Sequence, residues 1–199
     1  MAAGRCRWPF GYRTPGPVSE HRSVYLAGVA DLTPVEGRLF AVLEQGAAGP
    51  LADGRAELVV TTQRAFWDLP QVEEGTRMIG LVPAVDGAWR IGVLHGEVVD
   101  DYKGWHLFVG DGPHFEFWEG SETDYQETLQ IVRAVVQGNC RHWWTQEQMR
   151  GLLRPWRTFA YWVHHAEVVL PGDVVHASYQ GAGVTPEEPD PREVRATPY

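Results

Sequence analysis

The stretch 105–136 constrains the fold of this chain most, because strand alternation, turn chemistry and helix capping agree within it. Residues 105–109 and 114–118 are rich in aromatic and β-branched residues, which favour a pleated, half-buried strand. Between them, Gly110-Asp-Gly-Pro113 offers glycines that permit positive φ and a proline that stops further pairing. The sequence therefore predicts a β-hairpin at this place.

The register of this hairpin decides which side chains share a face. If Val109 pairs with His114, then Trp105 faces Trp118, and one face carries Trp105, His114, Glu116 and Trp118. The opposite face would hold phenylalanines, so this register predicts a hairpin that is covered on both sides. A slip of one residue would move every side chain to the other face.

A helix is predicted directly after the hairpin. Thr123 is a candidate N-cap with Gln126 three residues later, and Gly138-Asn139 is a natural stop. The apolar residues recur at helical spacing, which predicts that one side of this helix packs on the sheet. They are Tyr125, Leu129, Val132 and Val136.

The remaining elements follow from similar local signals. The capping box Thr33-Pro-Val-Glu36 predicts a helix to about Gln45, and a second box, Thr145-Gln-Glu-Gln148, predicts one through about Arg154. Residues 159–170 fit a strand or the start of a helix. Strands are predicted over 23–32, 56–62, 78–82, 88–94 and 140–144.

These elements predict an α+β fold, with a mostly antiparallel twisted sheet and about three helices in one domain over residues 18–180. Residues 1–17 hold three arginines and no acid and are predicted to form an irregular basic arm. Residues 181–199 hold four prolines and few apolar residues, which predicts a disordered tail.

Composition narrows the class of protein. The chain has 199 residues, 44% of them hydrophobic and 22% charged, as in ordinary soluble globular proteins. Two cysteines are too few for a Cys-rich zinc site or a disulfide scaffold. The sequence has neither the apolar run of a signal peptide nor a stretch long enough to span a membrane. A reducing, cytoplasmic setting is therefore expected.

The motifs of the large enzyme families are absent from the sequence. It holds no phosphate-binding G-x-x-x-x-G-K-[ST] loop, no G-x-S-x-G elbow and no H-E-x-x-H helix. His114-Phe-Glu116 matches the first half of the zinc-deaminase signature, but Cys140 lacks the second cysteine that the signature requires. These absences favour a function without catalysis.

A divalent metal site is one alternative, and it would make the chain a small metal-dependent enzyme. His114-x-Glu116 and His165-x-Glu167 each place an imidazole and a carboxylate on one face of a strand. Two such strands side by side would supply two His and two Glu ligands to zinc, iron or manganese. The competing interpretation is a solvated sheet face. His95, His106 and His164 are further candidates.

A tryptophan platform is a second alternative. Trp105 and Trp118, with Glu116 and the pair Asp100-Asp101, would suit a sugar ring or an organic cation. Core packing is the competing interpretation, since aromatic residues dominate cores. Trp143 is a further candidate, because adjacent tryptophans on a strand face opposite sides and one of them must meet another layer, a ligand or a partner.

The net charge of −9 points to a basic partner. It disfavours nucleic acid, whose phosphates require a basic face. An acidic surface with Trp and Tyr anchors instead suits a basic protein. In outline the chain resembles the small immunity proteins that neutralise basic nuclease toxins, a likeness of composition and class without a shared motif. A binding or interaction protein is therefore the favoured function.

Overall fold

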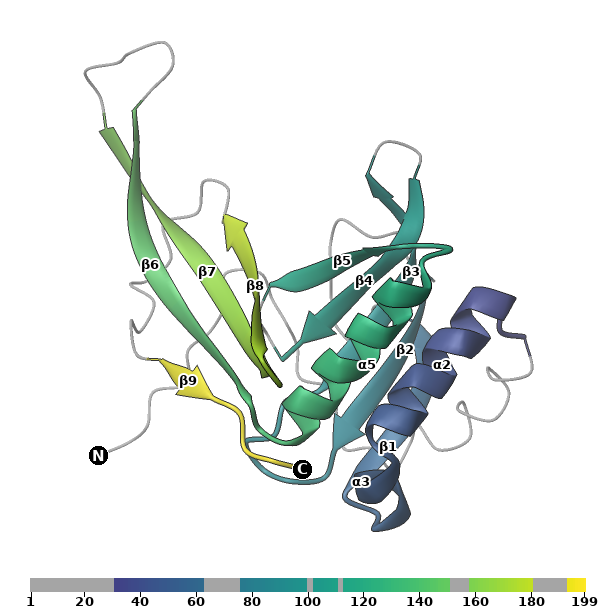
Figure 1. Cartoon of the computed structure of the whole chain (residues 1–199). Helices are drawn as coiled ribbons and strands as arrows, with labels where there is room; N and C mark the ends of the chain where they lie inside the picture. The colour runs from purple at the N-terminus through teal and green to yellow at the C-terminus, as the bar shows by residue number, and fades with distance from the viewer. Residues whose placement is uncertain (1–30, 63–75, 100–101, 111–112, 151–157, 181–192) are drawn as a thin grey trace.

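The computed structural model describes residues 31–62, 76–99, 102–110, 113–150, 158–180 and 193–199. In this part of the chain three helices accompany two antiparallel sheets, which confirms the α+β class (Figure 1). Two sheets stand where the sequence predicted one. The basic arm predicted over 1–17 and nearly all of the strand predicted over 23–32 lie outside the described residues.

The first sheet has the strand order β1-β2-β3-β4-β5, so neighbours in sequence are neighbours in space. The second sheet has the order β8-β7-β6-β9. The strands of the first sheet are β1 (Ala56–Thr62), β2 (Arg77–Pro83), β3 (Ile91–Val99), β4 (Tyr102–Val109) and β5 (His114–Trp118). Those of the second are β6 (Cys140–Arg150), β7 (Thr158–Leu170), β8 (Asp173–Gln180) and β9 (Val194–Arg195). The helices are α2 (Pro34–Gly46), α3 (Ala48–Ala52) and α5 (Glu122–Val136).

The helices α2 and α5 lie side by side and cover one face of the first sheet (Figure 1). The predicted apolar side of α5 is confirmed, because Tyr125, Leu129 and Val132 are buried. Trp105 of β4 is fully buried, with its ring centroid 4.5 Å from that of Tyr125. Its indole N–H donates to Thr128 Oγ1 at 3.1 Å, which satisfies the one polar atom of the side chain in the core.

The helix caps show how far local signals reach. The capping box of Thr33 and Glu36 is present, and α2 begins at Pro34 as predicted. The N-cap of α5 is two residues earlier than predicted, because the side chain of Ser121, not that of Thr123, accepts the N–H of Asp124. Gly138 follows the helix with φ of 76°, which confirms the predicted stop.

The register of the β4–β5 hairpin differs by one residue from the prediction. Phe108, not Val109, pairs with His114, and Trp105 pairs with Phe117. Trp105 and Phe117 therefore share the buried face, while Trp118 lies on the opposite face. The loop between β4 and β5 is longer than the predicted pairing requires. Packing of the hairpin against the helices selects the register that buries the larger apolar surface.

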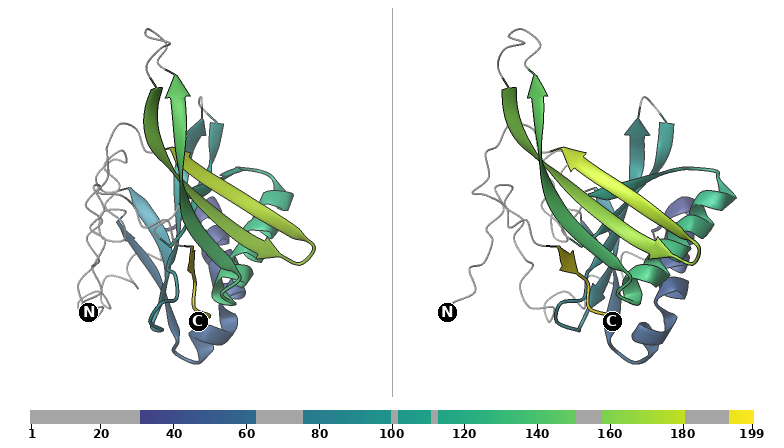
Figure 2. Two further views of the ribbon diagram at one scale, coloured as in Figure 1. Left: turned by 90° about the vertical axis from the view of Figure 1, so that its left-hand side faces the viewer. Right: turned by 60° about the vertical axis from the view of Figure 1, so that its left-hand side comes forward.

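The long β6–β7 hairpin replaces the helix that was predicted from Thr145 to about Arg154. β6 continues through Arg150, and its residues 145–150 pair in register with residues 158–163 of β7. This pairing also decides the ambiguous segment 159–170 in favour of a strand. A ladder with a neighbouring strand outweighs a local capping pattern. Figure 2 shows the far end of this hairpin projecting beyond the first sheet.

The last residues of the chain belong to the fold, so the prediction of a disordered tail is wrong for 193–199. β9 pairs with β6 through Arg141 and His142. Tyr199 is only 5% exposed, its hydroxyl donates to the carbonyl of Trp89, and its N–H donates to Val136 O at 2.9 Å. Residues 181–192 lie outside the described part. Composition alone did not reveal an anchor that works through tertiary hydrogen bonds.

Candidate functional site

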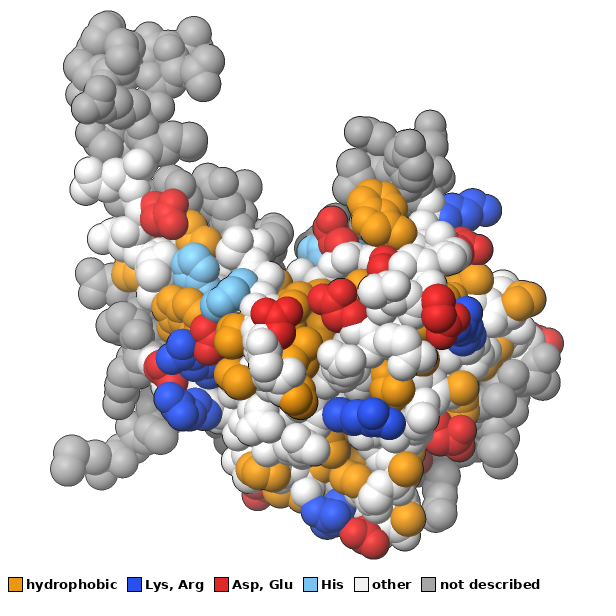
Figure 3. Space-filling view, viewed as in Figure 1, with side chains coloured by type: hydrophobic (Ala, Val, Ile, Leu, Met, Phe, Trp, Pro, Cys, Tyr) orange, Lys and Arg blue, Asp and Glu red, His pale blue; other side chains and the backbone are white. Residues whose placement is uncertain are grey.

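A groove of about 720 Å³ runs between the two sheets. One wall is β5, at the edge of the first sheet, and the other is β8, at the edge of the second. Asp124 and Glu127, in the first turns of α5, complete the lining. Figure 3 shows Asp and Glu side chains gathered along the hollow between the sheets.

β5 presents both side chains and backbone to this groove. Phe115 and Phe117 point into the core, whereas Trp118 is 45% exposed. The N–H of Trp118 donates to Asp124 Oδ2 at 2.8 Å, while the N–H of Glu119 donates back to Lys103 O of β4. Since such groups alternate along an antiparallel strand, the backbone N–H and C=O of Glu116 and His114 point away from β4, towards the groove.

The groove is acidic. Glu116, Asp124 and Glu127 contribute carboxylates, and none of the described residues that line it is Lys or Arg. Burial raises the pKa of Glu127, and the negative charges of Asp124 and Asp173 raise it further. Glu127 and Asp124 therefore lie close enough to repel one another, and a cation placed between them would relieve that repulsion.

A compact group of His106, His114 and Glu116 lies on the outer face of β4 and β5. Their candidate ligand atoms all lie within 4.8 Å of one another. His114 Nε2 is 3.1 Å from Glu116 Oε1, and His106 Nδ1 is 3.9 Å from the same oxygen. His106 was noted in the sequence only as one of several further histidines; the cross-strand pairing of His106 with Glu116 assembles the group.

The predicted set of four metal ligands is not brought together. His114 and Glu116 meet on the first sheet, as period-two spacing predicts, but His165 and Glu167 contact other residues of the second sheet. His165 Nε2 lies 2.7 Å from Thr145 Oγ1. In the described part of the chain, neither His165 nor Glu167 belongs to a group of three potential metal ligands.

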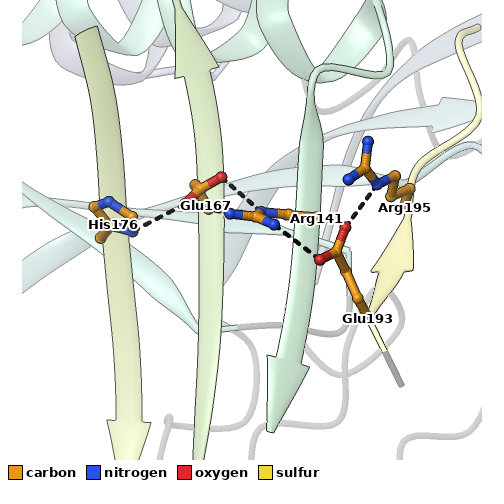
Figure 4. A network of polar contacts seen from close by, with 5 residues as sticks. All are labelled: Arg141, Glu167, His176, Glu193 and Arg195. Atoms are coloured by element: carbon orange, nitrogen blue, oxygen red, sulfur yellow. Dashed lines mark hydrogen bonds and ion pairs between the residues drawn. The ribbon is translucent and has the colours of Figure 1, made fainter. Parts of the chain in front are cut away.

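Glu167 belongs to a network of charged side chains that runs across the second sheet from β8 to β9 (Figure 4). Its two oxygens accept from Arg141 Nε at 2.6 Å and Nη2 at 3.0 Å, and His176 lies 3.6 Å away. Glu193 bridges Arg141 and Arg195. Hydrogen bonds from Arg141 hold the pKa of Glu167 below its usual range. The two carboxylates are matched by two guanidinium groups, so this network has a structural role.

The predicted Trp platform is contradicted by the register. Trp105 is fully buried and cannot meet a ligand together with Trp118 on the opposite face. Asp100 and Asp101 lie outside the described residues. Trp143 is half-buried and stacks on His165, with ring centroids 5.2 Å apart. Its neighbour Trp144 stacks on His164, so the adjacent tryptophans contact different histidines of β7 on opposite faces of the sheet.

The wall formed by β8 was missed by the sequence analysis, which predicted no strand after residue 170. The alternation of apolar and polar residues in Val175-His-Ala-Ser178 is the signal that would have found it. Asp124 was not among the candidate site residues either. Its place beside the groove follows from its bond to Trp118.

No protein-family model matches this sequence, and neither a curated protein nor a solved structure is similar enough to count as a match. No helix in the described ranges is long and apolar enough to cross a membrane. The groove and the histidine group are therefore interpreted from their own chemistry.

Proposed function

We propose that this chain is a binding protein that docks an extended, basic segment of a partner protein in the groove between β5 and β8. The observation that carries this proposal is an edge strand flanked by carboxylates. The backbone of β5 at His114 and Glu116 points towards the groove, where a further strand would find hydrogen-bond partners.

Charge selects the kind of partner. Glu116, Asp124 and Glu127 would meet Lys or Arg side chains of an added strand, and the overall charge of −9 would steer a basic protein towards the groove. The same charges would repel phosphates, so we do not propose a nucleic acid as the occupant.

Apolar surface at the groove would supply affinity as well. Trp118 is exposed at one end of β5, and Val175 and Ala177 of β8 are half-buried on the other wall. Tryptophan is favoured at the energetic centres of interfaces. An extended segment that alternates basic and apolar residues would therefore contact the carboxylates with its basic side chains and the apolar surface with its apolar side chains.

The proposal is tested with a peptide of alternating Lys and Val, titrated into the purified chain and followed by calorimetry. We expect saturable binding that weakens with added salt, because exposed charges are screened. Glu127→Gln and Glu116→Gln should each weaken binding several-fold. Glu44→Gln removes the same charge from the exposed side of α2 and should leave the affinity unchanged.

A second measurement locates the peptide. Trp118→Phe should remove most of the change in tryptophan fluorescence on binding, since Trp118 lines the groove. A peptide of alternating Glu and Val should not bind. If Glu44→Gln weakens binding as much as Glu127→Gln, or if the acidic peptide binds equally well, the groove is not the docking site.

A further inference from the structure

We propose that His106, His114 and Glu116 bind a divalent first-row transition-metal ion, with Zn²⁺ as the best match. Two imidazoles and one carboxylate are a donor set that such ions prefer, and Zn²⁺ accepts all three. This inference goes beyond the proposed function and does not depend on it, although two of the three ligands, His114 and Glu116, also line the groove.

The distances suit a single ion. Zinc bonds nitrogen at about 2.0–2.1 Å and oxygen at about 2.0–2.2 Å, so two of its tetrahedral ligands lie roughly 3.3 Å apart. The two His–Glu separations are 3.1 and 3.9 Å, and all three ligand atoms lie within 4.8 Å of one another. If the side chains rotate so that each ligand atom moves by about an ångström, all three atoms reach bonding distance of one zinc ion, and the strands need not move.

The sheet fixes the positions of the three ligands. His106 stands directly opposite Glu116 across the β4–β5 ladder, and His114 precedes Glu116 by two residues on the same face. Phe108 contacts both imidazoles, with ring centroids 6.2 Å from His106 and 5.1 Å from His114. Ligands on strands are held more precisely than ligands on loops, and an apolar neighbour restricts the rotation of both rings.

The exposure of the group indicates an open coordination position. The side chains of His106, His114 and Glu116 are 15%, 26% and 44% exposed. The ion would therefore sit at the surface, with three protein ligands and water in the remaining place. That arrangement is typical of zinc sites that bind or activate a further ligand, whereas structural zinc sites use four protein ligands.

The test uses the full chain without a histidine tag, because a tag binds the same ions. Zn²⁺ is titrated by calorimetry, and Co²⁺ replaces it for the visible absorption bands that report ligand number and geometry. We expect one ion per chain. His106→Ala and His114→Ala should each weaken binding by at least about 10-fold, since even indirect supports of a metal site contribute that much.

The chain offers a matched control. His95 Nε2 lies 3.2 Å from Glu119 Oε2, a His–Glu pair of the same chemistry for which the described residues offer no third ligand. His95→Ala should leave metal affinity unchanged, and Glu116→Gln should weaken it without unfolding the chain. If His106→Ala does not fold, as judged by circular dichroism, His114→Ala decides the question, because that side chain is more exposed.

Two outcomes would overturn the metal site: no saturable Zn²⁺ binding by the tag-free chain, or binding that survives both His106→Ala and His114→Ala. The groove is tested separately. Glu127→Gln should weaken binding of the basic peptide and leave Zn²⁺ affinity unchanged. His106→Ala should weaken Zn²⁺ binding and leave the affinity for the peptide unchanged. The failure of one proposal is therefore distinguishable from the failure of the other.

Discussion

The two faces of the β4–β5 hairpin share a backbone and differ in almost everything else. The inner face carries Trp105 and Phe117, which are buried and stack on each other, and Trp105 packs against Tyr125 of α5. The outer face carries His114, Glu116 and the exposed Trp118. Because neighbouring side chains point to opposite faces, one short segment both holds the fold together and presents binding groups. Substitutions on the inner face should act on stability, and those on the outer face on binding.

The largest expected effect tests this contrast directly. Trp105→Ala should lower the free energy of unfolding by about 3–5 kcal/mol, because it leaves a cavity in a packed core. It also removes the indole N–H that donates to Thr128 Oγ1, whose hydroxyl still donates to Asp124 O. Trp118→Ala should cost less than about 1 kcal/mol, since that side chain is exposed. Urea unfolding measures both, and similar costs for the two variants would contradict the assignment of the faces.

A buried histidine of the second sheet predicts that the stability of the chain depends on pH. His164 is buried, and burial together with the charges of His142 and His165 lowers its pKa from 6.5 to about 3. Between those values the unfolded chain binds a proton that the folded chain excludes, so stability falls as the pH decreases from about 6.5 to about 3. The slope from this one proton approaches about 1.4 kcal/mol per pH unit.

The measurement is urea unfolding at several pH values between 7 and 4, compared with His164→Gln. The variant cannot take up that proton, so its stability should depend less on pH in this range. His114→Gln serves as the control from the outer face of the first sheet, where the imidazole is partly exposed. Parallel pH profiles for the wild-type chain and His164→Gln would exclude His164 as the source.

Two glycines of α2 have different surroundings: Gly46 faces α5, whereas Gly37 faces open space. A Cβ at Gly46 would lie 2.4 Å from Val132 Cγ1, so Gly46→Ala should destabilise the fold by about 1–3 kcal/mol. A Cβ at Gly37 would meet nothing within 4 Å. Gly37→Ala should therefore stabilise the chain by about 0.5–1 kcal/mol through helix propensity. Thermal unfolding reports both signs, and a shift in the same direction for both would refute the close approach of α2 and α5.

A modest effect is expected at the end of the chain. Tyr199→Phe keeps the buried ring and removes only the hydroxyl that donates to the carbonyl of Trp89. It should cost about 1 kcal/mol, which is typical of one buried hydrogen bond. Thr197→Ala is the comparison, because the Thr197 side chain is exposed and its backbone bond to Gly87 is retained. If Tyr199→Phe has no effect in urea unfolding, residues 193–199 do not anchor the fold as described.

Several elements were determined by the sequence alone. The capping box at Thr33, the strand over 56–62, the helix stop at Gly138 and the apolar side of α5 each follow from signals within a few residues. Such signals are read correctly because the physical cause is local: a side chain that caps a backbone N–H, or a glycine that adopts positive φ. The α+β class follows from these elements together.

The tertiary structure decided everything that depends on contacts between distant residues. It shifted the β4–β5 register by one residue, extended β6 through the predicted helix and fastened Tyr199 against Trp89. That register buries Trp105 and places His106 opposite Glu116. Local sequence fits two adjacent registers almost equally well, and only the apolar surface buried against the helices separates them. Residue types were visible from the start, but their assembly into a groove and a histidine group required the packed fold.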